Sequence, residues 1–259
     1  MTTIGLALGG GGALGAAHLA LLEELDKADI RVDEVAGASA GAIVGLLYAS
    51  GGSRRVDEFL EMANATLFTP RNILSSITPR ALFARLEKRL REFVPERRFE
   101  DFGVKLSVIV TPLIEGRMEV STSGDPVKAV LASAAYPAVF PVQVIAGRPF
   151  IDGGVTRSVP VDVLRSHGCK FVIASSLNVV EKLDRVSSSR ARVSARSVDI
   201  AFCEFERLQA DQADFVFRPK LTRSYWYRFD KMDVILREAR SGMAGVIDEL
   251  KTALARTAP

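Results

Sequence analysis

The residues best suited to chemistry begin with Ser39, the centre of a Gly-Ala-Ser-Ala-Gly sequence at residues 37–41. A short apolar stretch precedes this sequence, and a helical pattern of small residues follows it. Gly-x-Ser-x-Gly between a strand and a helix is typical of a nucleophile elbow, a sharp turn that exposes the serine hydroxyl. Gly37 and Gly41 leave room for neighbouring backbone at that turn, and the helix N-terminus favours negative charge beside Ser39. Because five-residue patterns also recur by chance, the motif needs support from elsewhere in the chain.

A glycine-rich loop can meet a second requirement of acyl transfer. The chain runs from an apolar stretch at residues 4–8 into Gly9, Gly10, Gly11 and Gly12. Attack on an acyl carbonyl places negative charge on its oxygen, and backbone N–H groups stabilise this oxyanion. Glycine has no Cβ to keep a substrate oxygen away from the backbone. We therefore expect Gly10, Gly11 and Gly12 to form the oxyanion hole.

The same glycines have a second interpretation, as part of a nucleotide-binding site. Gly10, Gly12 and Gly15 have the spacing of the dinucleotide fingerprint, and Asp33 or Glu34 lies roughly the right distance further on. In that fold, however, the acidic residue ends the second strand. Here both acids precede the strand, so we disfavour a dinucleotide site.

Asp152 is the candidate general base. It follows an expected strand at residues 148–151, and Gly153 and Gly154 permit a tight turn directly after it. Active-site groups in such sheets gather at the carboxyl ends of the strands, where we expect Asp152 to lie. A carboxylate that acts directly on a serine needs a pKa raised by burial. Asp-Gly-Gly is also an ordinary turn sequence, so this motif too needs support.

The two histidines fit the role of base less well. The chain order of Ser39, Asp152 and His167 matches an α/β-hydrolase triad. His167, however, ends an expected helix and precedes a strand, which places it at the opposite edge of the sheet. His18 lies one turn into the first expected helix, where we expect it to pack or cap.

Taken together, these motifs resemble those of the patatin-like phospholipases. The Gly-Gly-Gly-Ala-Leu-Gly sequence at residues 10–15, the Ser39 motif and Asp-Gly-Gly at 152–154 occur in that family's order, and the similarity extends from about residue 4 to residue 254, including residues 132–141 and 213–219. The resemblance implies a Ser39–Asp152 dyad without histidine, a glycine-loop oxyanion hole, a lipid or acyl-ester substrate and no cofactor. One departure is Leu14, which stands where the family usually has a basic residue that could hold an anionic headgroup.

The hydrophobic pattern predicts an α/β fold formed by a single domain over residues 1–259. Strands and helices alternate, which favours a three-layer α/β/α arrangement with a mainly parallel central sheet, patatin-like by the resemblance. The arginine- and serine-rich segment at residues 181–196 is expected to be a solvated loop, with a basic lid that faces an anionic surface as the alternative. The helix expected at residues 80–94 has apolar residues on one face, which we expect to pack on the core, with membrane contact as the alternative. The expected strands lie at residues 4–8, 35–38, 105–110, 117–121, 148–151, 171–175 and 214–217, and the expected helices at 16–28, 40–50, 56–66, 80–94, 126–135, 161–166, 198–211 and 231–254.

Composition bounds the remaining possibilities. The 259 residues carry a formal net charge of +3, which is too modest to indicate a dedicated nucleic-acid-binding protein. Cys169 and Cys203 lie in apolar surroundings and are expected to be free thiols, as in a reducing cytoplasm. With two histidines and no Cys/His cluster, we expect no metal site. The N-terminus lacks a basic signal region and the longest apolar run is too short to span a bilayer, so we expect a cytoplasmic protein, with transient contact at the inner membrane surface as an open alternative.

The sequence therefore predicts a serine acyl hydrolase that cleaves lipid carboxylic esters through an acyl-enzyme. Two alternatives stay open. One is a binding or regulatory module whose catalytic site has decayed, which the Leu14 departure motivates. The other is a hydrolase of soluble esters or thioesters that makes no membrane contact. The residues do not specify the headgroup, the acyl chain or the oligomeric state.

Overall fold

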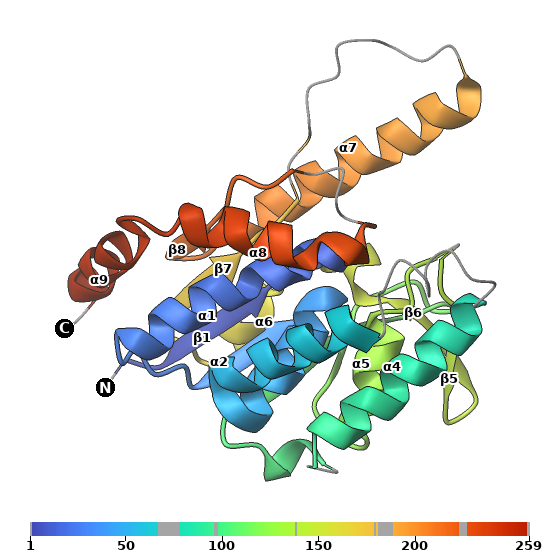
Figure 1. The fold of residues 1–259 in the computed structure, drawn as a ribbon, viewed down its shortest axis with the longest axis horizontal. Helices are drawn as coiled ribbons and strands as arrows, with labels where there is room; N and C mark the ends of the chain where they lie inside the picture. The colour runs from blue at the N-terminus through green and yellow to red at the C-terminus, as the bar shows by residue number, and fades with distance from the viewer. Residues whose placement is uncertain are drawn as a thin grey trace.

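A computed structural model describes residues 2–66, 78–95, 98–137, 139–178, 180, 189–222 and 227–257. Eight strands of this part of the chain form one sheet, in the order β5-β6-β3-β2-β1-β7-β8, with β4 beside β3 (Figure 1). Neighbours from β3 to β8 along this order are parallel, whereas β4, β5 and β6 pair antiparallel at one edge. The strands are β1 (Ile4–Leu8), β2 (Glu34–Gly37), β3 (Lys105–Pro112), β4 (Glu119–Ser121), β5 (Gln143–Ile145), β6 (Arg148–Asp152), β7 (Phe171–Ser175) and β8 (Phe215–Phe217).

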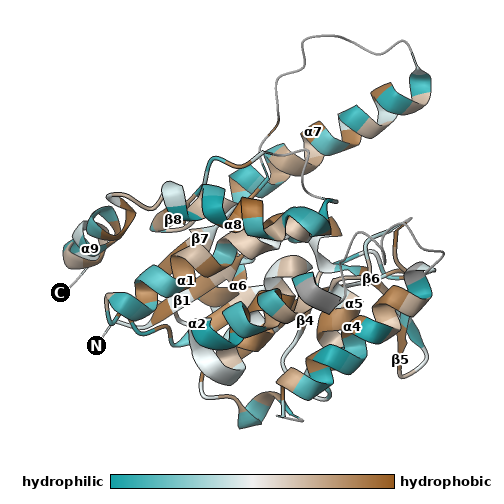
Figure 2. Ribbon diagram, viewed as in Figure 1, coloured by the Kyte–Doolittle hydropathy of each residue, from teal (hydrophilic) through white to brown (hydrophobic). Residues whose placement is uncertain are grey.

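Helices cover both faces of this sheet. Along β1, Leu6 and Leu8 join a large apolar cluster that also contains residues of α1, α2, α4, α5 and α8, whereas Ala7 joins a second cluster with residues of α6 and the end of α7. This alternation is what a strand buried on both faces requires, and Figure 2 shows the apolar strands between the helices. The predicted three-layer α/β/α architecture is confirmed. The helices are α1 (His18–Lys27), α2 (Ala40–Thr66), α4 (Pro79–Phe93), α5 (Pro126–Ser133), α6 (Val161–Ser166), α7 (Arg190–Ala210), α8 (Met232–Ser241) and α9 (Val246–Thr257).

Most expected elements are present, and their ends follow local backbone chemistry. Asp29, two residues after α1, has a φ of 55°, a left-handed conformation that Asp tolerates better than most residues. The helical backbone of α2 is interrupted at Gly51 and Gly52, where the sequence placed a break. The expected C-terminal helix is instead two helices, α8 and α9, which are separated near Gly245, a residue with a φ of 79°.

The segment expected to be a loop at residues 181–196 is corrected in its second half. Residues 190–196 form the first turns of α7, and residues 181–188 lie outside the described part of the chain. This end of α7 projects away from the sheet (Figure 1), so few of its side chains are buried and no apolar periodicity marks the helix. Arginine and alanine are nevertheless good helix formers. The sequence also gave no sign of β5, a three-residue edge strand.

The amphipathic helix α4 packs on the core, as expected. Phe83, Leu86 and Leu90 are buried, and Thr78 caps the helix by accepting a hydrogen bond from the N–H of Ala81. Its apolar face is therefore occupied by the protein interior. The Thr-Pro pairs at residues 69–70 and 78–79 predict a loop that leads into this helix, but residues 67–77 lie outside the described part of the chain. In the described segments, no helix combines the length and apolar character needed to cross a membrane.

Candidate active site

Ser39 has the backbone conformation expected of a nucleophile elbow. It joins β2 to α2 with a φ of 53°, and its side chain is partly exposed. A Cβ at Gly41 would lie 2.2 Å from the carbonyl oxygen of Leu8, and a Cβ at Gly37 would lie 2.4 Å from that of Gly41. Since real Cβ atoms do not approach backbone so closely, the turn requires both glycines. The structure thus places Gly37, Ser39 and Gly41 as the motif predicted.

The glycine loop lies beside this turn because β1 and β2 are parallel neighbours with Leu8 in register with Gly37. A Cβ at Gly10 would lie 3.4 Å from the Cβ of Ser39, and Gly12 has a φ of 57°. Among the described residues, the N–H groups of Gly10, Gly11 and Gly12 have no hydrogen-bond partner. Unpaired donors next to a serine hydroxyl are what an oxyanion hole requires.

Asp152 is buried at the same edge of the sheet, with 2% of its surface exposed. Its Oδ1 accepts a 2.7 Å hydrogen bond from the N–H of Gly154. Its Oδ2 has no completed hydrogen bond within the described part of the chain. Burial raises the pKa of Asp152 to about 7, against the smaller lowering effects of the Ser39 hydroxyl and the Gly154 N–H. The carboxylate therefore has one oxygen without a hydrogen-bond partner and a near-neutral pKa. The hydroxyl of Ser39 is close enough to this carboxylate to affect its pKa.

The strand that carries Asp152 does not run parallel to the central strands, although the sequence favoured that direction. The sequence placed Asp152 at the carboxyl end of a strand in a largely parallel sheet, but β6 is antiparallel to β3. β3 extends beyond β2, since Val108 is in register with Gly37 and the strand continues to Pro112. β6 runs back along this extension and ends with Asp152 beside Val110. Its last residue therefore lies near the elbow, although the strand points the opposite way.

The turn after Asp152 depends on its glycines. A Cβ at Gly153 would lie 2.0 Å from the carbonyl oxygen of Ile109, so the turn packs directly on the backbone of β3. Gly154 supplies the N–H that orients the carboxylate. Thr111 donates a 3.0 Å hydrogen bond to the carbonyl oxygen of Asp152 from the other side. Both predicted supporting glycines thus have a defined structural role.

A connection between the two candidate catalytic residues was missed at the sequence level. The buried hydroxyl oxygen of Ser133, at the end of α5, accepts a 2.9 Å hydrogen bond from the N–H of Ser39. Two residues later, the carbonyl oxygen of Ala135 accepts a 3.1 Å hydrogen bond from the N–H of Asp152. Both lie in the segment at residues 132–141 that carried part of the resemblance. The segment fixes the backbone of both residues.

Neither histidine is hydrogen-bonded to Ser39 or Asp152 in the described residues. His167 lies at the amino edge of the sheet, with its Nδ1 2.6 Å from Oε1 of Glu34. His18 is fully buried, with its Nε2 2.9 Å from the carbonyl oxygen of Gly9 and its Nδ1 2.8 Å from the hydroxyl of Ser175. Burial lowers the pKa of His18 to about 4, so the ring is neutral at pH 7. The sequence predicts that His18 packs or caps, whereas its ring contacts the backbone of the glycine loop, next to the candidate site.

The acids of the alternative nucleotide site lie away from the glycine loop. The side chain of Asp33 accepts a hydrogen bond from the N–H of Ile4, at the start of β1. Glu34 is likewise bound at this edge by His167 and Ser107. The described residues contain no group of three or more metal-binding side chains. Cys169 and Cys203 are both buried, and no disulfide joins them, as predicted.

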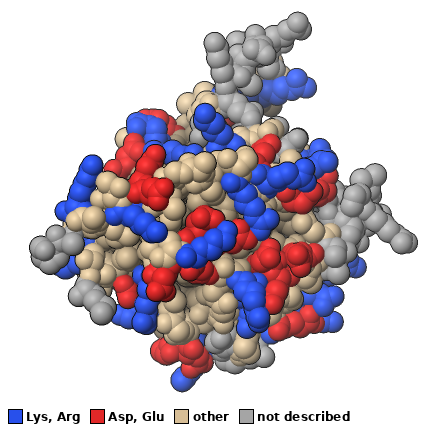
Figure 3. All heavy atoms as spheres, turned by 60° about the vertical axis from the view of Figure 1, so that its left-hand side comes forward, with Lys and Arg blue, Asp and Glu red and all other residues tan. Residues whose placement is uncertain are grey.

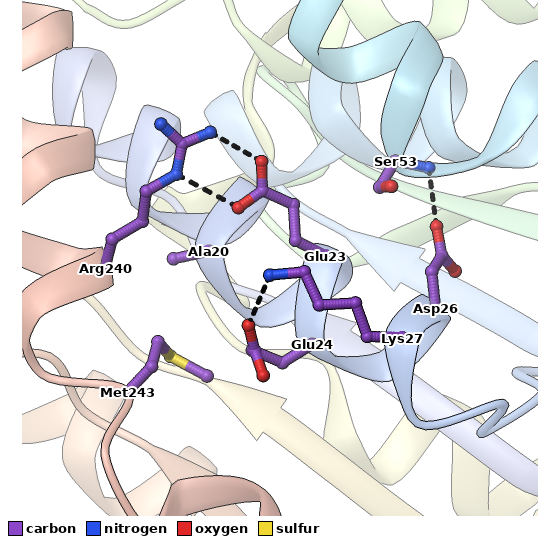
Figure 4. Close-up of a pocket in the computed structure, with 8 residues that line it drawn as sticks. All are labelled: Ala20, Glu23, Glu24, Asp26, Lys27, Ser53, Arg240 and Met243. Atoms are coloured by element: carbon purple, nitrogen blue, oxygen red, sulfur yellow. Dashed lines mark hydrogen bonds and ion pairs between the residues drawn. The ribbon is translucent and has the colours of Figure 1, made fainter.

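A surface pocket of about 650 Å³ lies between α1, α2 and α8 (Figure 4). Four of its five charged side chains pair with one another, since Arg240 binds Glu23 and Lys27 binds Glu24. The fifth, Asp26, accepts a hydrogen bond from the N–H of Ser53. The chain leaves this end of α1 to enter β2 beside Ile4, so the pocket lies toward the edge opposite Ser39. The face drawn in Figure 3 likewise mixes both signs of charge, without a patch of one sign. The candidate functional site is therefore the Ser39 edge rather than this pocket.

A known protein family matches the part of the chain that carries these motifs. Residues 6–165, more than half of the chain, match the patatin-like phospholipase family. The match includes the glycine loop, Ser39 and Asp152. The chain therefore belongs to the patatin-like phospholipase family.

Individual relatives share only part of their length with this chain. An NTE family protein of Mycobacterium tuberculosis, described as uncharacterized, is 33% identical over 181 residues, which are 68% of this chain and 49% of the relative. Patatin-like phospholipase domain-containing protein 6 of Homo sapiens is 28% identical, over 70% of this chain and 14% of the relative. Lysophospholipase NTE1 of Kluyveromyces lactis is also 28% identical, over 69% and 13%. The chain thus spans about half the length of the mycobacterial relative.

Two bacterial proteins are similar among solved structures. VipD from Legionella pneumophila has a TM-score of 0.46 at 15% identity, over 93% of this chain and 67% of VipD. The type III effector protein ExoU has a TM-score of 0.48 at 16% identity, over 96% of this chain and 53% of ExoU.

Proposed function

We propose that the protein is a serine acyl hydrolase that cleaves lipid carboxylic esters with Ser39 as nucleophile and Asp152 as general base. The observation that carries this proposal is the buried Asp152 carboxylate, which keeps one oxygen unpaired beside the elbow serine. Burying a carboxylate without full hydrogen bonding costs folding free energy. Such unfavourable arrangements persist mainly at sites where they serve a function.

The geometry supports a two-step reaction. Ser39 Oγ attacks the acyl carbonyl carbon while its proton passes to Asp152 Oδ2, and the carbonyl oxygen takes up the negative charge. The N–H groups of Gly10, Gly11 and Gly12 stabilise this oxyanion. The C–O bond to the alcohol then breaks, and the leaving oxygen takes the proton from Asp152. Water repeats the sequence on the acyl-enzyme and releases the fatty acid with Ser39 restored.

A carboxylate can act without a histidine here because of its surroundings. General bases work best when their pKa lies near the working pH. An ordinary aspartate is too weak a base, but the pKa of Asp152 is about 7 as a result of burial. Oδ1 is held by the Gly154 N–H, which leaves Oδ2 for the proton.

Apolar side chains near the dyad support a fatty acyl substrate. Tyr136 follows Ala135, whose carbonyl binds the N–H of Asp152, and 41% of the surface of Tyr136 is exposed. Val139 lies in the same segment, and Val155 follows the Asp152 turn directly; both are also exposed. Exposed apolar residues around a site favour an apolar ligand. Leu14 is fully buried in the core, so it contributes no charge for a headgroup.

Release of fatty acid from defined esters tests the proposal. We expect hydrolysis of lysophosphatidylcholine and of long-chain nitrophenyl esters, with kcat/KM rising by at least about tenfold from butyrate to palmitate as more apolar surface is bound. A preference for butyrate that vesicles leave unchanged would instead identify a hydrolase of soluble esters. No turnover on any chain length, from folded protein, would contradict the proposal and favour a binding module.

A further inference from the structure

Two successive peptide groups of the glycine loop are held by buried side chains that the proposed reaction does not use. His18 Nε2 lies 2.9 Å from the carbonyl oxygen of Gly9. This oxygen can only accept, so the ring donates from Nε2 and its Nδ1 accepts from the Ser175 hydroxyl. Asn178 Nδ2 donates a 2.9 Å hydrogen bond to the carbonyl oxygen of Gly10. The carbonyl groups of Gly9 and Gly10 therefore point toward the protein interior.

Planar peptide geometry turns these contacts into a constraint on the N–H groups. All described peptide bonds are trans, and in a trans peptide the C=O of one residue and the N–H of the next point in opposite directions. Holding the Gly9 carbonyl fixes the direction of the Gly10 N–H, and holding the Gly10 carbonyl fixes that of Gly11. These two N–H groups have no partner among the described residues. They face away from the side chains that hold the loop.

Asn178 is itself held by Glu206, a fully buried residue of α7. Glu206 Oε2 accepts hydrogen bonds of 2.6 Å from Asn178 Nδ2 and from the hydroxyl of Ser158. Its Oε1 accepts from the hydroxyl of Ser176 and from the N–H groups of Leu177 and Asn178. With five donors around one carboxylate, the amide of Asn178 has a single favourable orientation.

Neither Asn178 nor Glu206 is part of the family match, which ends at residue 165. Glu206 also contacts neither Ser39 nor Asp152 by any hydrogen bond that the described residues show. A carboxylate buried at this depth is costly unless it is fully hydrogen-bonded. Its contacts lead through Asn178 to the backbone that borders the nucleophile.

We propose that Glu206 and Asn178, together with His18, are positioning residues that aim the N–H groups of Gly11 and Gly10 at the acyl oxygen. This inference rests on the proposed function, because only acyl transfer produces an oxyanion for these N–H groups to stabilise. Glu206 sets the amide of Asn178, Asn178 sets the Gly10–Gly11 peptide, and His18 sets the Gly9–Gly10 peptide. Fixed N–H groups stabilise the transition state, because its acyl oxygen carries a developing negative charge. They stabilise the bound ester less, because its carbonyl oxygen carries less charge.

Three variants test the Glu206–Asn178 connection. Glu206→Gln replaces one carboxylate oxygen with an NH₂ group, so the carboxamide cannot accept at every position, and Asn178→Ala removes the donor to Gly10. Gln209→Ala is the matched control, because Gln209 is buried one turn further along α7 and binds the Val159 N–H rather than the glycine loop. We expect kcat to fall ten- to a hundredfold in the first two variants, since one lost oxyanion donor costs about 10²–10³. KM is expected to change less than twofold.

The pH profile and thermal stability separate positioning from loosening of the fold. The two variants should keep the wild-type inflection of kcat/KM near pH 7, because the surroundings of Asp152 are unchanged. Gln209→Ala should keep the wild-type kcat even where its melting temperature falls as far as theirs. Equal kcat in all three variants, or a shifted inflection in Glu206→Gln, would overturn the proposal.

A readout without turnover separates this proposal from the proposed function. Hydrogen exchange over residues 9–14 reports on the Gly9 and Leu14 amides, which bind the carbonyls of Ser175 and Gly11. Faster exchange in Asn178→Ala and Glu206→Gln than in Gln209→Ala is expected if the loop is held from Asn178. If the wild type hydrolyses no ester, the proposed function fails, and unchanged exchange in these variants would show that the positioning fails as well.

Discussion

Replacing Ser39 with alanine is expected to lower ester hydrolysis by at least about a thousandfold. The substitution removes only Oγ, the atom that attacks the ester, and substrate contacts plus the oxyanion hole leave a small residual rate. The fold should persist because the N–H of residue 39 still donates to Ser133. Alanine also tolerates the φ of 53° about as well as serine does.

Steady-state hydrolysis of a long-chain ester measures this loss. Ser50→Ala is the matched control, because Ser50 lies on α2, the helix that follows Ser39, and its hydroxyl donates to the nearby carbonyl of Leu47. Both variants should unfold at temperatures close to that of the wild type. Turnover of Ser39→Ala within tenfold of the control would exclude Ser39 as the nucleophile.

Asp152→Asn is expected to lose activity and gain stability at the same time. An amide cannot accept the serine proton, so kcat/KM should fall by at least about a thousandfold. Asparagine keeps an oxygen that can accept from the Gly154 N–H, and it removes a buried charge. The site thus trades folding stability for a reactive base.

The stability gain should depend on pH in a defined direction. The pKa of Asp152 is about 7 when folded and about 3.8 when unfolded, so between these values the folded protein binds a proton that the unfolded chain does not. Wild-type stability from this group therefore falls as pH rises from about 4 to 7. At pH 8 the ionised carboxylate costs up to about 4 kcal/mol, from about 1.4 kcal/mol per pKa unit. Asparagine carries no charge, so Asp152→Asn should lack this cost.

Two measurements check the Asp152 prediction. Denaturant unfolding should show Asp152→Asn to be more stable than the wild type at pH 8, with the difference shrinking toward pH 4. The wild-type kcat/KM should rise with pH to a plateau above about pH 7, because Asp152 must be ionised to take the proton. A wild-type profile that is flat from pH 5 to pH 8 would contradict the assignment of Asp152 as the base.

The candidate site could be predicted largely because its parts are local sequence signals. The Ser39 elbow and the turn after Asp152 need glycine at fixed offsets, since a Cβ at Gly41 or Gly153 would collide with backbone. Parallel neighbouring strands then place the glycine loop beside Ser39, as the alternation of strands and helices predicted. The direction of β6, the strand that carries Asp152, could not be predicted, because it depends on pairing with the extension of β3.

The residues that hold the glycine loop left no such signal. Asn178 lies 168 positions from Gly10 in the sequence, and Glu206 lies on a helix whose exposed half reads as a loop. A single buried acid among the other charged residues of α7 is indistinguishable from a surface residue until tertiary contacts are known. His18 was expected to pack, and its hydrogen bond to Gly9 follows from the fold rather than from its position in the helix.

Labelling with a fluorophosphonate probe tests the central claim most directly, because the probe reacts with serines that are activated as nucleophiles. Peptide mass spectrometry then locates the adduct. We expect one adduct on Ser39 in the wild type and at least about a hundredfold slower labelling in Asp152→Asn, which lacks the base. An adduct on another serine, or equal labelling of Ser39 in Asp152→Asn, would contradict a dyad of Ser39 and Asp152.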